Sequence, residues 1–376
     1  MCEINSHGGI TTIREILEVC LQNGASLALP GEFTKRAFLN GRIDLSQAEA
    51  TIDIINAKTK KESKSALIQL EGFLSEEIAK LRQKALDIMV DIEASIDYPE
   101  YDIDEVTNAQ TEQFLEEMKD ALGKLVESFE TGKIIKEGIS VAIIGCPNVG
   151  KSSLLNAMLK EERAIVTDIA GTTRDSIEEV IAIEGIPFKI IDTAGIRDVK
   201  NEVEKIGIER AKKIAENSDV IIAMFDISKE LGKEEKEILK FIKDKKAIII
   251  LNKTDLKTSG SQNGDQIKDY CKKIIEMSIL KKEGIEELNK TLIEMFNINE
   301  IDLDNEVLVT NIRHKNLIEE AAKNVEIAKK SLQEKMPIDI IAINIRDVIE
   351  ALGEITGENV SEDIIKEIFA KFCLGK

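Results

Sequence analysis

The stretch that most constrains this chain is a glycine-rich loop between an apolar run at residues 139–144 and a helical pattern at residues 154–159. It reads Gly145-Cys146-Pro147-Asn148-Val149-Gly150-Lys151-Ser152 and fits the phosphate-binding pattern G-x-x-x-x-G-K-[ST]. The two glycines let the backbone curl until several N–H groups and a helix N-terminus point at one anionic centre. We therefore predict a nucleotide-phosphate site, in which Lys151 reaches the terminal phosphates and Ser152 binds Mg²⁺. A chance glycine-rich turn is the alternative.

Length and charge narrow the class of protein. The 376 residues are enough for two or three domains, each with its own core. The balance of 51 basic to 70 acidic residues gives a net charge of −19, which provides no general attraction to nucleic acid or to an anionic membrane. Any RNA contact must therefore be local or come from a partner. No apolar run reaches the roughly 18 residues of a membrane span, and the start does not resemble a signal peptide, so we expect a cytoplasmic protein.

The first 40 residues indicate the end of a larger unit. A helical pattern from Ile13 to Leu21 stops at Asn23-Gly24, and a second turn follows at Pro30-Gly31. Such a short segment cannot form an independent α/β domain, and we expect its upstream part to be missing.

Two helical blocks flank the centre of the chain, and we expect them to pack as one bundle. In residues 41–136 we predict one long helix that begins with a capping box, Ser46 to Glu49, and ends before Pro99, followed by a second helix over residues 113–135. The helices expected in residues 299–376 are 308–332, 338–352 and 364–372, the last capped by Ser361.

Residues 137–298 alternate between strand and helix, which is typical of a doubly wound α/β sheet. The pair Glu184-Gly185 is a tight turn and predicts one antiparallel hairpin in an otherwise parallel sheet. This α/β unit is therefore predicted to be an insertion between the two helical blocks. The expected strands are residues 139–144, 178–183, 188–192, 220–226, 247–252 and 273–277.

Two motifs at the ends of later strands indicate which nucleotide binds. Asp192-Thr193-Ala194-Gly195 offers a carboxylate that can hold Mg²⁺ through water and a glycine N–H that can reach a γ-phosphate. Asn252-Lys253-Thr254-Asp255 offers a carboxylate that can accept from N1–H and the 2-amino group of guanine, whereas adenine has no such pair of donors. Asn252 would support the loop, and the stem of Lys253 would pack on the base. The site is therefore predicted to select GTP.

A polar segment of switch type, Thr167 to Asp175, lies between the glycine-rich loop and these motifs. We predict that Thr173 completes the Mg²⁺ shell. Ile196 stands where small signalling GTPases carry a glutamine that orients water, and an isoleucine cannot do this. A nearby carboxylate, Glu202 or Glu204, is therefore expected to orient the attacking water.

Four motifs spread along the chain carry a resemblance to a known family: the segment from Pro30 to Gly41, the P-loop from Gly145 to Ser153, Gly171-Thr172-Thr173-Arg174-Asp175 and Phe372-Cys373-Leu374-Gly375-Lys376. Over its whole length the chain resembles the MnmE (TrmE) family of tRNA-modification GTPases. The resemblance implies an α/β plus all-α fold, in which a Ras-like P-loop GTPase domain (137–298) is inserted into a helical-bundle domain (41–136 and 299–376). A partial N-terminal α/β domain (1–40) precedes them.

The resemblance implies a potassium-dependent GTPase whose G domains form a homodimer across their nucleotide faces. Asn148 resembles the K⁺ ligand, helped by Thr167, Ile169 and Thr172. Such a cation would neutralise the charge that develops between the β- and γ-phosphates. Glu204 resembles the family's water-orienting glutamate.

The family acts with the FAD-containing partner MnmG, in a heterotetramer, on C5 of the wobble uridine of certain tRNAs. It installs aminomethyl or carboxymethylaminomethyl groups with a one-carbon unit from a methylene-tetrahydrofolate. Glu3, Arg42 and Lys376 match the folate site, and Cys373 resembles the C-terminal cysteine that modification needs. Because the resemblance implies that the chain begins within the N-terminal domain, we expect folate binding and stable dimerisation to depend on the part upstream.

Two alternatives remain open. The chain could be a ribosome-assembly GTPase that acts as a binding switch on rRNA without modifying it, or an inert scaffold that binds nucleotide without turnover. The predicted catalytic residues are Glu204, Lys151 and Cys373. The predicted GTP-binding residues are Asn148, Val149, Gly150, Lys151, Ser152, Ser153, Thr167, Asp168, Ile169, Ala170, Gly171, Thr172, Thr173, Asp192, Thr193, Ala194, Gly195, Asn252, Lys253, Asp255 and Ser278.

Overall fold

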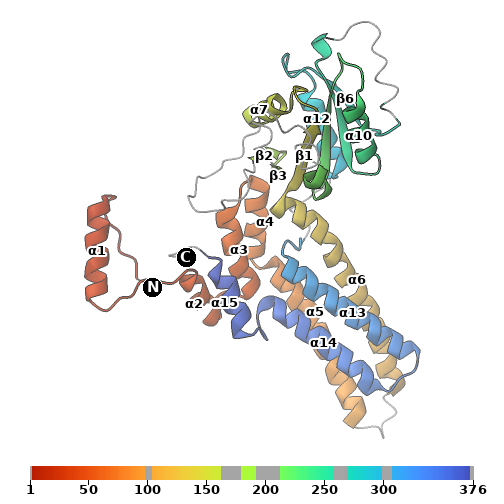
Figure 1. The fold of residues 1–376 in the computed structure, drawn as a ribbon. Helices are drawn as coiled ribbons and strands as arrows, with labels where there is room; N and C mark the ends of the chain where they lie inside the picture. Colours follow the sequence, from red (N-terminus) through yellow and green to blue (C-terminus); the bar gives the residue numbers. More distant parts are fainter. Residues whose placement is uncertain are drawn as a thin grey trace.

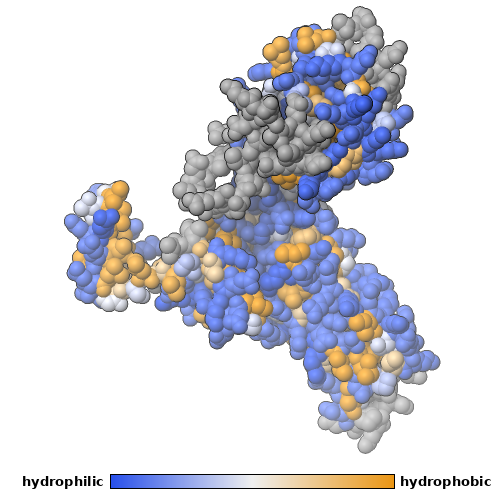
Figure 2. All heavy atoms as spheres, viewed as in Figure 1, coloured by the Kyte–Doolittle hydropathy of each residue, from blue (hydrophilic) through white to orange (hydrophobic). Residues whose placement is uncertain are grey.

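The computed structural model describes residues 2–97, 104–161, 179–191, 212–256, 267, 269–298 and 307–372. A sheet domain stands at one end of a longer helical body (Figure 1). The first helix, α1 (Ile10–Gln22), lies apart from that body and has no buried residue. Ile10 and Ile13 of this helix are exposed. Figure 2 shows apolar residues on the surface of the helix. The helix ends at Asn23, as the sequence predicts.

The described residues form one sheet of six strands in the order β2-β3-β1-β4-β5-β6. β2 and β3 are antiparallel and are joined by the turn at Glu184-Gly185, whereas all the other neighbours are parallel. The predicted hairpin in an otherwise parallel sheet is therefore confirmed. The strands are β1 (Ile139–Gly145), β2 (Glu179–Ile183), β3 (Ile186–Ile190), β4 (Val220–Asp226), β5 (Ala247–Asn252) and β6 (Ile274–Met277).

The central strands are buried along their whole length, which explains why their sequences are continuous apolar runs. Every residue of β4 and β5 is buried. A parallel sheet reaches this state only when helices cover both faces. Among the described residues of this domain, the helices are α7 (Lys151–Glu161), α10 (Lys233–Ile242) and α12 (Ile285–Met295).

The helical body is built from both ends of the chain. The long helices α5 (Phe73–Asp97) and α6 (Asp104–Glu137) share one buried core with α13 (Ile312–Gln333) and α14 (Ile338–Thr356). The expectation of a single bundle is therefore confirmed. A smaller cluster joins α2 (Glu32–Leu39) and α3 (Leu45–Asn56) to α15 (Glu362–Ala370), which begins with Ser361 as its N-cap as predicted.

The predicted single helix from Ser46 to Pro99 is wrong, because the chain breaks twice. The segment forms α3, α4 (Lys60–Leu70) and α5 instead. Ala57 ends α3, and Thr59 caps α4 by accepting from the backbone N–H of Glu62. Gly72, with φ of 95°, separates α4 from α5 in a conformation that glycine adopts readily.

The predicted capping box of Ser46 and Glu49 is also wrong. Asp44 is the N-cap of α3, and its carboxylate accepts from the N–H of Gln47 while the Gln47 side chain accepts from the Asp44 N–H. The same kind of motif therefore occurs two residues earlier, with an aspartate as the cap. Ser46 lies inside the helix, where its oxygens accept from Gln69.

The two domains meet where α6 runs into β1. Gly138 connects them with φ of 78°, and a Cβ at this position would lie only 2.2 Å from the backbone oxygen of Pro187 in β3. The hairpin turn also contacts the helical body, because a Cβ at Gly185 would lie 3.0 Å from the stem of Lys61 in α4. At both positions, a side chain would crowd the contact between the domains. No described helix has the length and apolar character needed to cross a membrane.

Candidate functional site

The predicted nucleotide residues of the described chain gather at the carboxyl ends of the parallel strands. β1 ends at Gly145, which pairs with Met224 of β4. Asp226 at the end of β4 pairs with Asn252 at the end of β5, and Asn252 pairs with Met277, the residue before Ser278. Ligands of open α/β sheets bind at this edge.

The P-loop owes its shape to its two glycines. Gly145 has φ of 155° and Gly150 has φ of 109°, and a Cβ would lie 2.5 Å from the Met224 oxygen at the first and 2.4 Å from Asn252 Nδ2 at the second. Asn148, between them, has φ of 62° and is exposed. Helix α7 begins directly after the loop, so that its N-terminus faces the same space as the loop.

Lys151 folds over the P-loop. Its Nζ donates to the backbone oxygens of Gly145 at 2.7 Å and Cys146 at 2.9 Å. Burial lowers its pKa. Burial also raises the pKa of the Cys146 thiol to about 12, with Glu235 as a further cause, so this thiol stays protonated at neutral pH and is a poor nucleophile.

Asn252 links the P-loop to the predicted guanine loop. The side chain is buried, and its Nδ2 donates to the Val149 oxygen at 2.7 Å. Ser278, also buried, donates from Oγ to Asp255 Oδ1 at 2.6 Å. The carboxylate that is predicted to recognise guanine is thus held from the neighbouring strand end.

Sequence reasoning missed Asp226 as a member of this cluster. Its Oδ2 accepts from the Nζ of Lys253 at 2.6 Å, and Lys253 itself has φ of 68°. Burial acts to raise the pKa of Asp226, but the hydrogen bonds from Lys253 and Ser228 prevail and lower it. The signal available in the sequence was the position of Asp226 at the end of a predicted strand, and the parallel register of the structure sets it opposite Asn252.

The structure describes some of the remaining predicted site residues and not others. Of the folate residues, Glu3 and Arg42 are described and exposed. The predicted residues that lie outside the described chain are Thr167, Asp168, Ile169, Ala170, Gly171, Thr172, Thr173, Asp192, Thr193, Ala194, Gly195, Glu204, Cys373 and Lys376.

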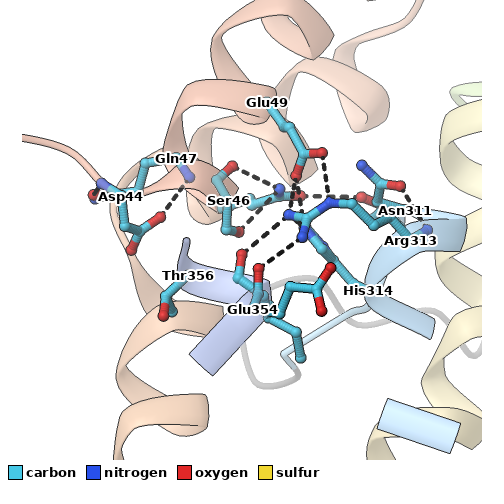
Figure 3. A network of polar contacts seen from close by, with 12 residues as sticks. Asp44, Ser46, Gln47, Glu49, Asn311, Arg313, His314, Glu354 and Thr356 are labelled. Atoms are coloured by element: carbon cyan, nitrogen blue, oxygen red, sulfur yellow. Dashed lines mark hydrogen bonds and ion pairs between the residues drawn. The ribbon is translucent and has the colours of Figure 1, made fainter. Parts of the chain in front are cut away.

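A second polar cluster, which the sequence did not reveal, lies inside the helical body (Figure 3). Glu49 of α3 accepts from Arg313 Nε at 3.0 Å and Nη2 at 2.9 Å, and its Oε2 lies 2.7 Å from His314 Nε2. Arg313 also donates to the backbone oxygens of Glu354 at 2.8 Å and Ile355 at 3.0 Å, near the end of α14. The cluster thereby ties α3 to α13 and α14.

The charges of this cluster depend on one another. Burial acts to raise the pKa of Glu49, but His314 and Arg313 prevail and lower it to about 2. Burial lowers the pKa of His314 against the opposing effect of Glu49. The buried Nδ1 of His314 has no hydrogen-bond partner among the described residues, which fits a neutral ring that donates from Nε2.

The fold and the site together define a Ras-like P-loop GTPase domain inserted into a helical bundle. A family model described as "MnmE helical domain" matches residues 45–373, and one described as "GTP-binding protein TrmE N-terminus" matches residues 1–42. The chain belongs to the MnmE family of tRNA modification GTPases.

Curated relatives agree with this assignment. The chain is 50% identical, over 374 residues, to the tRNA modification GTPase MnmE of Acetivibrio thermocellus, covering 100% of this chain and 82% of the relative. It is also 50% identical to MnmE of Alkaliphilus oremlandii, covering 100% of this chain and 81% of the relative. A solved structure of Era from Aquifex aeolicus bound to GDP·AlF4⁻ is 30% identical, covers 50% of this chain and 66% of that one, and has a TM-score of 0.33.

The protein is therefore a GTP hydrolase that takes part in tRNA modification. This assignment favours a tRNA-modification GTPase over the alternative of a ribosome-assembly GTPase without modification chemistry.

Proposed function

We propose that this chain hydrolyses GTP with Mg²⁺ in a potassium-dependent reaction, as a dimer formed through its G domains. The observation that carries the proposal is the position of Asn148. Its exposed side chain stands at the crest of the P-loop with φ of 62°, whereas Lys151 is turned inward onto the loop carbonyls. An amide at this crest can reach a cation beside the phosphates and the face of a second G domain.

The residue types fit the two metal ions. Hydroxyl and amide oxygens are hard ligands, and such ligands suit Mg²⁺ and K⁺ better than thiolates or imidazoles do. Ser152, in the first turn of α7, and Thr173 would hold Mg²⁺. Asn148, with Thr167, Ile169 and Thr172, would hold K⁺. The potassium ion would neutralise charge that develops between the β- and γ-phosphates.

The chain's own residues have distinct roles in this reaction. Lys151 would leave its carbonyl partners to bind the terminal phosphates, and Glu204 would orient the attacking water. Asp255 would accept from guanine while Ser278 holds its carboxylate. The switch residues 167–173 and the segment 192–195 would complete the phosphate contacts.

We also propose that the chain works with an FAD-containing partner of the MnmG type, in a heterotetramer, on C5 of the wobble uridine of certain tRNAs. A methylene-tetrahydrofolate would supply the one-carbon unit, bound by Glu3, Arg42 and Lys376, and Cys373 would serve the modification step. Because the net charge is −19, tRNA would be held by local contacts or by the partner.

The deciding experiment is steady-state GTP hydrolysis in KCl and in NaCl at equal ionic strength. We expect a large potassium advantage that disappears in Asn148→Lys, since the lysine removes the amide ligand and puts its own charge in that place. GDP binding by the same variant should persist and shows that its site is folded. Equal rates in both salts would contradict the potassium mechanism.

Two substitutions separate the other roles. Glu204→Ala should abolish hydrolysis and keep GTP binding, and a loss of binding would instead make this residue structural. Asp255→Asn should shift preference away from guanine, because an amide presents a donor to N1–H. An unchanged GTP affinity would contradict the role in base recognition.

A further inference from the structure

We propose that Asp226 is a positioning residue for guanine recognition, which acts by holding Lys253 and, through it, the loop that carries Asp255. The proposal rests on the guanine site proposed above. It adds a residue at the end of a different strand, β4, that belongs to none of the predicted nucleotide-binding motifs. Its function would be in binding the base, and the chemistry at the phosphates would not depend on it.

The carboxylate of Asp226 has a specific partner at each oxygen. Oδ2 accepts from the Nζ of Lys253 at 2.6 Å, and Oδ1 accepts from the N–H of Ser228 at 3.1 Å and from its Oγ at 2.6 Å. Only 5% of the Asp226 side chain is exposed, against 29% for Lys253. A carboxylate buried with this set of donors is fixed in position, because moving it would leave a buried charge without partners.

The backbone brings this carboxylate to the right place. Asp226 and Asn252 are opposite each other at the ends of β4 and β5, and the N–H of Ile227 donates to the Asn252 oxygen at 3.0 Å. The parallel ladder therefore continues one step beyond the strands. Lys253, the next residue, directly precedes the helical turn Thr254–Leu256 that contains Asp255, and its backbone oxygen accepts from the N–H of Leu256 at 2.9 Å.

Lys253 needs an external restraint. Its φ of 68° is a left-handed conformation, which is unfavourable for a residue with a side chain. A free lysine would also lose considerable side-chain entropy on being held in one position. The ion pair with Asp226 compensates for both and stretches the lysine stem across the strand ends, where a base can pack on it.

The test compares nucleotide affinity with turnover in Asp226→Asn. The amide keeps the size of the side chain and can still accept from Ser228, but it loses its charge toward Lys253. We expect the Kd for a fluorescent GDP analogue and the KM for GTP to rise about tenfold, the effect of losing one charged hydrogen bond. We expect kcat at saturating GTP to stay within about twofold of the parent value.

The chain offers a matched control in Asp53→Asn. Asp53 pairs with Lys136 at the same 2.6 Å and is also partly buried, but it joins α3 to α6 in the helical body. This variant should leave the nucleotide affinity unchanged. Equal losses of affinity in both variants would overturn the proposal, because they would reveal a general effect on folding. A fall in kcat without a change in KM for Asp226→Asn would overturn it as well.

A double-mutant cycle with Lys253→Met tests whether Asp226 acts through the lysine. Methionine keeps an unbranched stem and removes the ammonium. If Asp226 acts through Lys253, adding Asp226→Asn to this variant should cause no further loss of affinity. A further loss of about tenfold, as in the parent, would show independent action and would refute the proposal.

Failure of this inference and failure of the guanine site give different results. If Asp255→Asn shifts base preference while Asp226→Asn has no effect, the site stands and the positioning role falls. If neither variant changes affinity or base preference, the guanine site itself is wrong.

Discussion

Removal of Glu49 should destabilise the helical body more than removal of almost any other carboxylate. In Glu49→Ala, Arg313 loses two charged hydrogen bonds of 2.9 and 3.0 Å, and His314 loses the contact at 2.7 Å. Arg313 keeps its bonds to the two carbonyls near the end of α14, but its side chain is only 19% exposed and water cannot replace the carboxylate fully. Breaking a buried ion pair on one side costs about 3–5 kcal/mol, and we expect a loss in that range.

The assay is urea unfolding of the full chain, followed by far-UV circular dichroism with and without GDP. GDP should stabilise the sheet domain by mass action and thereby identify its transition. The transition that GDP does not move belongs to the helical body, and its free energy of unfolding gives the comparison with the parent. A calorimetric scan of both proteins provides an independent measurement.

The matched control is Glu117→Ala, which removes the carboxylate of an exposed pair with Lys84. Both partners of this pair are about half exposed, so the substitution should leave the transition of the helical body where it is. If Glu49→Ala shifted that transition no more than Glu117→Ala, the cluster would contribute nothing to stability and our reasoning would be refuted.

Three further predictions follow from the same structure. The pKa values of Glu49 and His314 in the folded protein lie below their ordinary values of 4.5 and 6.5, so the unfolded chain binds more protons than the folded one. The urea midpoint of the helical body should therefore fall as the pH drops from 7 to 4. A constant midpoint would contradict this. Gly150→Ala should weaken GDP binding at least about tenfold, through backbone strain at φ of 109°, and a titration with an unchanged Kd would speak against it. Ile345 is fully buried, and Ile345→Ala should lower the free energy of unfolding by about 2–5 kcal/mol. Ile343 is 55% exposed, and Ile343→Ala should lower it far less. Similar losses in the two variants would argue against the bundle.

Sequence alone predicts the sheet well, because its strands carry unambiguous local signals. β4 and β5 are continuous apolar runs that match the predicted bounds, and Glu184-Gly185 marks the hairpin. The helical block was harder, because its apolar periodicity continues across Ala57 and Gly72, where the chain turns. Local pattern also could not choose between two overlapping capping boxes.

Some residues of the site belong to motifs in the sequence, whereas others come together only through the fold. The P-loop, Asn252 and Asp255 follow from motifs that are contiguous in the sequence. Asp226 has no motif of its own, and only the parallel register brings it to Lys253. Glu49 pairs with a residue 264 positions further along, so nothing near it in the sequence indicates that it is buried.

The split helical body has a consequence for synthesis on the ribosome. Glu49 meets Arg313 only after 264 more residues have been added, which takes roughly 13–50 s at about 5–20 residues per second. During that time α5 and α6 have only each other to pack against, and their apolar surface that α13 and α14 cover in the folded protein stays open, because those two helices do not yet exist. The sheet domain, which is contiguous in the chain, can complete its core in the meantime. The nascent protein therefore carries a finished G domain on an open half-bundle, and the Glu49 cluster closes as one of its last steps.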